Sequence, residues 1–230
     1  MHSERKANMN SIRPIVTALI CLALVMAATV SSEETTTAQP NPALLDPSLA
    51  TEKAPDIYRV KMETTAGEFI IEVHREWAPL GADRFYNLVK IGYFTDVAFF
   101  RVLAGFMAQA GFHGDPAVSQ VWLNARIKDD PVTQSNSQGM VTFATGGPNT
   151  RSAQIFVNYG DNSYLDASGF APFGQVVEGF ESVQKLYSGY GEGAPNGKGP
   201  GQGKVFGRGN EYLKAEFPEL DYITKASIVE

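Results

Sequence analysis

The sequence is poor in the residues that carry nucleophilic and metal chemistry. Its single cysteine, Cys21, lies in an apolar N-terminal stretch, so the rest of the chain has no disulfide, thiol nucleophile or cysteine-based zinc site. The three histidines, His2, His74 and His113, are far apart and lack a nearby carboxylate motif, which argues against a histidine zinc site. A Ser-His-Asp arrangement stays open, although no Gly-x-Ser-x-Gly motif supports it. We therefore expect a function that needs no metal, no nucleophile and no cofactor.

Basic residues are also scarce relative to acidic ones. The chain has 19 Lys and Arg against 25 Asp and Glu, a formal net charge of −6 and a pI near 5.2. Proteins that bind nucleic acid normally carry a basic face, so we expect no nucleic-acid partner. Of the 230 residues, 43% are apolar and 11% aromatic, which is enough to fill a sizeable core. We expect a folded domain that acts as a monomer.

The first thirty residues differ from the rest. Arg5, Lys6 and Arg13 precede an almost uninterrupted apolar run over residues 15–30. A basic segment followed by such a run is typical of a secretory signal peptide, with cleavage expected within residues 27–32. The run is short for a membrane span, which needs roughly 20 residues, but an uncleaved N-terminal anchor is the alternative for residues 1–30. We expect an exported protein, periplasmic or secreted, or one anchored to a membrane by this segment.

The organisation of the remaining chain is predicted from composition and periodicity. Residues 31–55 are rich in Thr, Pro and Ala without periodicity and predict a flexible linker, so the domain is expected over residues 56–230. Tyr58, Val60 and Met62 alternate with polar residues and, after a turn, 69–73 follow as the second strand of a hairpin. Further short strands are expected at 97–102, 106–110, 140–144, 155–158, 173–177 and 223–229.

Two helices and one long loop complete this prediction. Pro79 suits the first turn of a helix that continues to Gly92, and a second helix is expected over residues 178–187. Residues 189–209 hold nine of the 22 glycines and predict a solvated loop; they lack the Lys-Ser/Thr pair of a phosphate-binding loop. Many short strands without βαβ alternation indicate a mainly β protein, either a barrel or a sandwich.

The segment FFRVLAGFMAQAG, residues 99–111, is the first candidate for a site. Its arginine, Arg101, is followed at five, six and eight positions by Phe106, Met107 and Gln109. On two strands joined by a turn at residues 104–105, these side chains could converge on one face. On this segment alone, the alternative is that the two apolar residues belong to the core and Arg101 is a surface charge.

Two later segments add to the pattern. The segment GMVTFATGGPNTRSAQIF covers residues 139–156, and YLDASGFAPFG covers residues 164–174. Together with the first segment, and in the same order, they resemble the cyclophilin family of peptidyl-prolyl cis/trans isomerases over about residues 57–229. The resemblance implies a closed eight-stranded antiparallel β-barrel capped by two α-helices. It also implies that the substrates are proline-containing peptides and unfolded protein chains.

The resemblance assigns roles residue by residue. Arg101 takes the place of the catalytic arginine, and Gln109 that of a glutamine that binds the substrate backbone. Phe106, Met107, Phe156 and Leu165 match the apolar pocket for the substrate proline. The remaining substrate-binding positions are Ala144, Thr145 and Gly146, whose backbone pairs with the peptide, Gln154, and the aligned Tyr164 and Phe170.

The chain departs from the family pattern at several of these positions. Phe100 replaces the usual histidine beside the arginine, and Thr145 stands where asparagine is usual. Tyr164 occupies the position of a tryptophan that many eukaryotic members use against cyclosporin, and Phe170 falls on the usual pocket histidine. These replacements resemble bacterial members and predict weak cyclosporin binding, but they leave the arginine, glutamine and apolar pocket in place.

Three functions are consistent with this pattern. The leading prediction is an isomerase that acts on X–Pro bonds of exported proteins and assists their folding. The alternatives are a proline-peptide-binding scaffold with little catalysis, and a chaperone that holds unfolded chains independently of proline.

Overall fold

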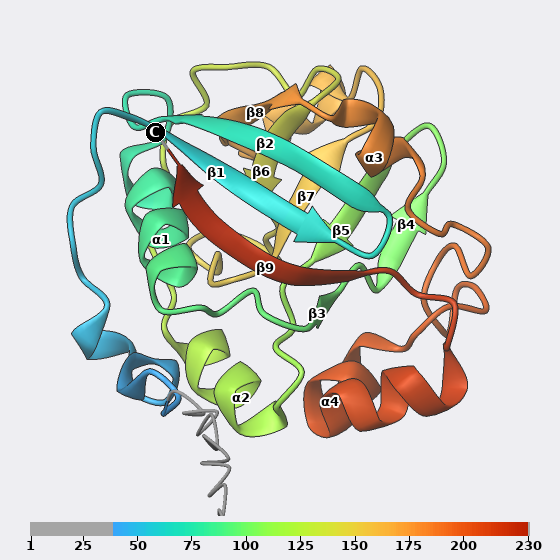
Figure 1. Ribbon diagram of the computed structural model, residues 1–230. Coiled ribbons are helices and arrows are strands. Elements are labelled where there is room, and N and C mark those ends of the chain that lie inside the picture. Colours follow the sequence, from blue (N-terminus) through green and yellow to red (C-terminus); the bar gives the residue numbers. More distant parts are fainter. Residues whose placement is uncertain (1–38, 230) are drawn as a thin grey trace, which may run out of the picture. The chain divides into compact units, whose positions relative to one another are not determined.

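The structure is a computed structural model that describes residues 39–229 (Figure 1). The expected signal peptide or anchor, residues 1–30, and the first part of the expected linker lie outside the described residues. Among residues 39–229, no helix has both the length and the apolar character needed to cross a membrane.

The centre of the domain is one curled antiparallel sheet of nine strands (Figure 1). Its order is β3-β9-β1-β2-β8-β6-β7-β5-β4, so strands distant in the chain become neighbours. The strands are β1 (Ile57–Thr64), β2 (Gly67–His74), β3 (Val97–Ala98), β4 (Arg101–Leu103), β5 (Met107–Ala110), β6 (Met140–Phe143), β7 (Ile155–Asn158), β8 (Pro172–Glu178) and β9 (Tyr222–Val229).

The sheet differs from the closed eight-stranded barrel that was predicted. Its two edge strands, β3 and β4, are the two ends of one short segment, separated only by Phe99 and Phe100. The Phe99 N–H donates to the Asp221 carbonyl (2.9 Å), while β4 pairs with β5 on the far edge. The expected single strand at 97–102 is therefore divided into β3 and β4. The curled sheet brings its two edges together at this segment, but no continuous hydrogen-bonded ladder joins them.

The predicted hairpin is confirmed. The alternation of buried and partly exposed side chains along its strands places apolar residues in the core that the curled sheet encloses, which we call the barrel core. Tyr58, Val60 and Met62 of β1 are buried, and Val60 lies opposite the equally buried Ile71 of β2. Burying every second side chain stabilises the fold by roughly 25 cal/mol for each Å² of apolar area removed from water. A slip of one residue would turn these side chains to the other face of the sheet, so their burial fixes the register. The predicted last strand is also present as β9, which pairs with β1 and β3.

Four α-helices are present in the described residues, where two were predicted. They are α1 (Pro79–Lys90), α2 (Pro116–Asn124), α3 (Phe180–Gln184) and α4 (Gln202–Glu216). α1 was predicted, and the Asp130 carboxylate accepts from its Leu80 and Gly81 N–H groups (3.0 and 2.9 Å), groups that a helix start leaves unpaired. The helix expected at 178–187 shrinks to α3, because β8 continues through Glu178.

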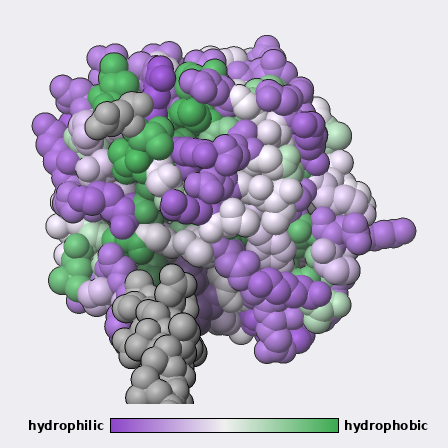
Figure 2. Space-filling view, viewed as in Figure 1, coloured by the Kyte–Doolittle hydropathy of each residue, from purple (hydrophilic) through white to green (hydrophobic). Residues whose placement is uncertain are grey.

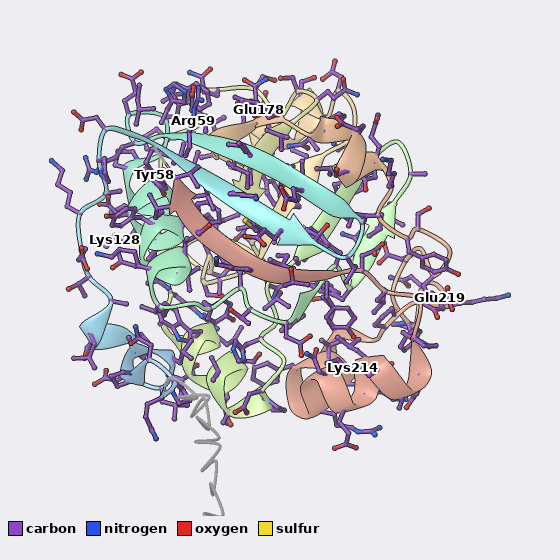
Figure 3. The ribbon with its side chains drawn as sticks, viewed as in Figure 1. Tyr58, Arg59, Lys128, Glu178, Lys214 and Glu219 are labelled. Atoms are coloured by element: carbon purple, nitrogen blue, oxygen red, sulfur yellow. The ribbon has the colours of Figure 1, made fainter. Side chains whose placement is uncertain are left out.

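Helix α4 occupies part of the stretch predicted as a loop, and it packs beside α2 (Figure 1). It is kinked at Gly209, whose φ of 52° and ψ of −138° are open to glycine at little cost. A Cβ at this position would collide with the Gly114 carbonyl, which accepts from the Asn210 N–H (2.9 Å). Lys214, labelled on α4 in Figure 3, reaches Asp96 at 2.8 Å. The kink therefore fits α4 closely against the chain before α2.

Residues 39–55, predicted as part of a flexible linker, pack on the domain. Two short 3-10 turns, η1 (Pro42–Leu44) and η2 (Pro47–Leu49), are capped by the Asn41 and Asp46 side chains. The Trp122 indole N–H donates to the Leu44 carbonyl (3.0 Å), and the Glu52 N–H donates to the Asn87 side chain (2.9 Å). The compact unit therefore begins at Gln39 rather than near Asp56, because proline-opened turns and long-range hydrogen bonds order this segment.

The face shown in Figure 2 is mainly hydrophilic, with smaller apolar areas among the polar side chains. Large apolar side chains that stay exposed near the N-terminal segment and α1 are Leu45, Leu49, Ile57 and Leu80. Single exposed side chains of this kind are ordinary on a protein surface.

Candidate active site

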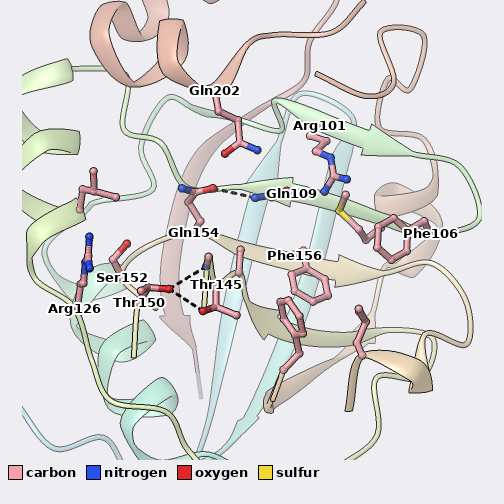
Figure 4. A pocket seen from close by; sticks show the side chains of 16 residues that line it. Arg101, Phe106, Gln109, Arg126, Thr145, Thr150, Ser152, Gln154, Phe156 and Gln202 are labelled. Atoms are coloured by element: carbon pink, nitrogen blue, oxygen red, sulfur yellow. Dashed lines mark hydrogen bonds between the residues drawn. The ribbon is translucent and has the colours of Figure 1, made fainter. Parts of the chain in front are cut away.

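The predicted site residues come together in one groove of about 550 Å³ (Figure 4). Those that line it are Arg101, Phe106, Met107, Gln109, Ala144, Thr145, Gly146, Gln154, Phe156, Leu165 and Phe170. The predicted residue outside the lining is Tyr164, which is 64% exposed and stacks on the Phe106 ring with centroids 6.4 Å apart. The geometry thus groups the predicted residues, while their roles stay predictions.

Strand register explains why these side chains meet. Arg101 on β4 lies opposite Gln109 on β5, and Gln109 lies opposite Phe156 on β7. Directly paired residues of antiparallel strands point to the same face of the sheet, so the three side chains form a row across three strands. Met107, two residues before Gln109, shares that face.

An apolar slot lies at one part of the groove. Met107 and Phe156 form its buried floor, and Phe170 meets the Phe156 ring nearly edge-on with centroids 5.8 Å apart. Phe106 and Leu165 complete the slot. A slot lined by aromatic and aliphatic side chains with no carboxylate suits a small apolar ring such as that of proline.

Polar side chains run from Arg101 along the groove. One Arg101 terminal nitrogen, Nη1, donates to Gln109 Oε1 (3.1 Å), and Gln109 Nε2 donates to Gln154 Oε1 (2.9 Å). The guanidinium carbon lies 5.9 Å from the centre of the Phe106 ring. Because Arg101 is only a donor, its bond fixes the orientation of both amides in turn. The groove therefore presents a positive donor directly beside the apolar slot.

Glu192 is a partner of Arg101 that the sequence did not indicate. Its carboxylate accepts from Arg101 Nε (2.8 Å) and Nη2 (2.7 Å), a two-bonded ion pair. The hydrogen bond from Arg101 is the main reason that the pKa of Glu192 lies below its ordinary value, and the Gly193 N–H also lowers it. A lone glutamate within a glycine-rich stretch carries no periodic or motif signal, so only the folded chain reveals this partner.

The other part of the groove is polar and is shaped by a turn. The Thr145 and Thr150 hydroxyls lie 2.9 Å apart, and the Gly146 N–H donates to Thr150 Oγ1 (2.9 Å) (Figure 4). These bonds fix the turn that follows Ala144, at the position where the family usually has asparagine. Leu123, Arg126, Ser152 and Gln202 also line this part and were not among the predicted site residues.

Phe100 explains one departure from the family pattern. It is buried away from the groove, against Phe112 with ring centroids 4.9 Å apart and among apolar residues of α4. Its neighbour Arg101 still lines the groove. The phenylalanine therefore belongs to the packing beneath α4.

Metal ligands are not gathered in the part of the chain that the structure describes. No group of three or more His, Cys, Asp or Glu side chains within residues 39–229 is arranged to hold an ion.

Comparison with known proteins identifies the class to which this fold and groove belong. Residues 59–200 match the family model of the cyclophilin type peptidyl-prolyl cis-trans isomerase/CLD. A peptidyl-prolyl cis-trans isomerase of Acinetobacter baylyi is 32% identical over 133 residues, which are 55% of this chain and 70% of that protein. The human peptidyl-prolyl cis-trans isomerase-like 3 is 31% identical over 134 residues, 55% of this chain and 80% of that protein.

A solved structure agrees at the level of the fold. A cyclophilin type peptidyl-prolyl cis-trans isomerase of Cryptosporidium parvum has a TM-score of 0.56 and 19% identity, covering 76% of this chain and 98% of that one. The chain described here belongs to the cyclophilin type peptidyl-prolyl cis-trans isomerase family and is an enzyme of that activity.

Proposed function

We propose that this enzyme catalyses the cis/trans isomerisation of X–Pro peptide bonds in exported proteins, and that Arg101 stabilises the twisted amide of the transition state. The observation that carries this proposal is the row of Arg101, Gln109 and Phe156, which sets a permanently charged donor next to an apolar slot. The reaction breaks no covalent bond, so it needs no nucleophile.

The chemistry explains why an arginine is suited to this task. Rotation must overcome a barrier of about 18–20 kcal/mol that arises from amide resonance. In the planar amide the proline nitrogen shares its lone pair with the carbonyl, whereas in the twisted amide the lone pair stays on nitrogen. A guanidinium at that nitrogen forms a hydrogen bond that is nearly absent in both ground states, which is the requirement for lowering a barrier.

The size of this effect can be bounded. A hydrogen bond to a charged group contributes about 1.5–3 kcal/mol, and about 1.4 kcal/mol corresponds to a tenfold change in rate. A 10⁵-fold acceleration requires about 7 kcal/mol, so the arginine supplies only part of it. We assign the rest to positioning: the slot holds the proline ring while Gln109 and the backbone near Ala144 hold the other side of the bond.

Replacement of Arg101 tests the mechanism. We expect Arg101→Ala to lower kcat/KM for a proline-peptide exchange reaction by about 10- to 150-fold, which is the loss of one charge-assisted bond. Arg59→Ala is the matched control, because Arg59 is a half-exposed arginine on β1 paired with Glu72 and does not line the groove. If Arg101→Ala turned over substrate as fast as the control, the proposed role of the guanidinium would be wrong.

The proposal of export rests on the N-terminal sequence. Arg5, Lys6 and Arg13 before an apolar run support cleavage within residues 27–32. N-terminal sequencing of the protein recovered outside the cytoplasm tests this: a start within or just after residues 27–32 supports export with cleavage, and a start at Met1 supports an anchor.

A peptide-binding role with little turnover is the second candidate. It is favoured by Thr145 and Phe170, two groove-lining residues that depart from the family pattern. Peptide affinity measured beside turnover separates the two functions, since tight binding without exchange would identify a scaffold.

A further inference from the structure

The donors of Arg101 are divided between two directions. Of its five N–H groups, one on Nε and one on Nη2 meet the Glu192 carboxylate, and one on Nη1 meets Gln109. One N–H therefore stays available on each terminal nitrogen. The guanidinium is rigid and planar, so a carboxylate that fixes one edge also fixes where the remaining donors point.

Glu192 holds this edge from outside the groove. Arg101 and Gln109 line the groove, whereas Glu192 is not among the residues that do. The carboxylate thus leaves room for a peptide beside the guanidinium. We propose that Glu192 is a positioning residue that holds Arg101 in the orientation in which its free donors face the proline slot, an inference that rests on the proposed function of Arg101.

The stretch around Glu192 is built to keep its carboxylate in place. Glu192 Oε1 also accepts from the Gly193 N–H (2.9 Å), and the Glu192 carbonyl accepts from the Gly199 N–H (2.8 Å). A Cβ at Gly197 or Gly199 would collide with that same carbonyl. The glycines that predicted a solvated loop are therefore the residues that let the chain fold tightly around Glu192.

This arrangement replaces flexibility with a defined side-chain position. Arginine has several rotatable bonds, and an unrestrained guanidinium would spend part of its time away from the slot. A bidentate ion pair between the guanidinium and one carboxylate is the geometry that best limits this motion, because both hydrogen bonds lie in the guanidinium plane. Misplacement of a reacting group by about 1 Å can cost on the order of 10²-fold, so even partial loss of orientation is measurable.

Two substitutions of Glu192 test the proposal. We expect Glu192→Ala to lower kcat by about 10-fold with little change in KM, since the slot that binds proline is untouched. The kcat of Glu192→Gln should lie between that of the parent protein and that of Glu192→Ala, because the glutamine amide oxygen accepts one Arg101 hydrogen bond whereas its NH₂ group faces the other Arg101 donor. Glu211→Gln is the matched control: Glu211 is an exposed glutamate of α4 bonded to Arg208.

A second measurement separates positioning from a general effect on the fold. In an Arg101→Ala background, Glu192→Ala should have no additional effect, whereas independent damage would lower activity again. The Arg101 Nε–H resonance in the NMR spectrum should lose its carboxylate-bound chemical shift in Glu192→Ala, with the melting temperature kept near that of the control.

The outcomes are distinct. Unchanged or raised kcat in Glu192→Ala, or an equal loss in the Arg101→Ala background, overturns the positioning role. Full activity of Arg101→Ala overturns the proposed function itself, so the two failures can be told apart.

Discussion

The molecule has two apolar cores that differ in how they are built. The barrel core is formed by alternate residues of the strands together with α1, including Val60, Ile71, Phe85, Phe143 and Phe173. The second core lies beneath α4 and comprises Ala98, Phe100, Phe112, Val205, Tyr212, Leu213, Phe217 and Leu220. Five of these eight residues follow residue 200, where the match to the family model ends.

The difference between the cores shows how the chain adapts a common fold. Phe99 is buried in the barrel core and Phe100 in the second core, so the segment before Arg101 is held by both. The family's usual histidine at position 100 would place a polar ring under α4, where Phe100 instead meets Phe112. Phe100 therefore fits the apolar packing beneath α4, and it does not line the groove.

The largest effect is expected from the barrel core. Phe173 is fully buried, with ring centroids 5.0 Å from both Phe85 and Phe143. We expect Phe173→Ala to lower the free energy of unfolding by about 3–5 kcal/mol, measured by chemical denaturation, because a large cavity is left. Val177→Ala on the same strand is exposed and should change it by less than about 0.5 kcal/mol. A cost similar to that of Val177→Ala would mean that the barrel core does not dominate stability.

The second core should give a smaller and more local effect. Leu213 is buried in α4, and we expect Leu213→Ala to cost about 2–3 kcal/mol. Hydrogen exchange should accelerate in α4 while the amides of β1 and β2 stay protected, since the strands keep their own packing. Equal loss of protection in both regions would show that the two cores form one cooperative unit, and Glu211→Gln again serves as the neutral substitution on this helix.

Restoring the family's histidine tests the link between the cores. Phe100→His buries a polar ring without a partner, and we expect a cost of about 1–3 kcal/mol with isomerase activity retained. Phe100→Leu keeps an apolar side chain and should cost less than about 1.5 kcal/mol. If Phe100→His were as stable as the parent protein, α4 would not be the reason for the phenylalanine.

The smallest effect is a pH dependence at the junction of α2 and α4. Burial is the main reason that the pKa of His113 lies below its ordinary value, even though Asp115 and Asp96 act in the opposite direction. The unfolded chain then binds a proton first as pH falls below about 6.5, so stability decreases until the pH passes the folded-state pKa. Denaturation curves at several pH values should show this slope, and His113→Gln should remove it. A slope that persisted in His113→Gln would belong to another group.

The elements predicted correctly from the sequence are those with strong local sequence patterns. The β1–β2 hairpin and α1 were correct because alternation and a proline-opened helical period are strong patterns. The groove residues could be grouped through the family motifs, although Tyr164 lies outside the lining.

The missed features depend on distant contacts or are hidden by composition. Helix α4 contains Gly203 and Gly207, each of which weakens a helix by roughly 1 kcal/mol relative to alanine, and it is kinked at Gly209; its packing against the second core offsets this cost. The break between β3 and β4 depends on a bond from Phe99 to Asp221, and the partner of Arg101 is 91 residues away at Glu192. No local pattern encodes such pairs.

The position of β4 at the edge of the sheet has a consequence for Arg101. Within residues 39–229, this three-residue strand has a ladder on one side only, with β5. An arginine in the middle of a sheet would lie on a strand held by backbone hydrogen bonds to two neighbouring strands. In this chain, Arg101 is held by side chains instead. The preceding Phe100 is buried in the second core, and the carboxylate of Glu192, from a distant part of the chain, accepts two hydrogen bonds from the guanidinium.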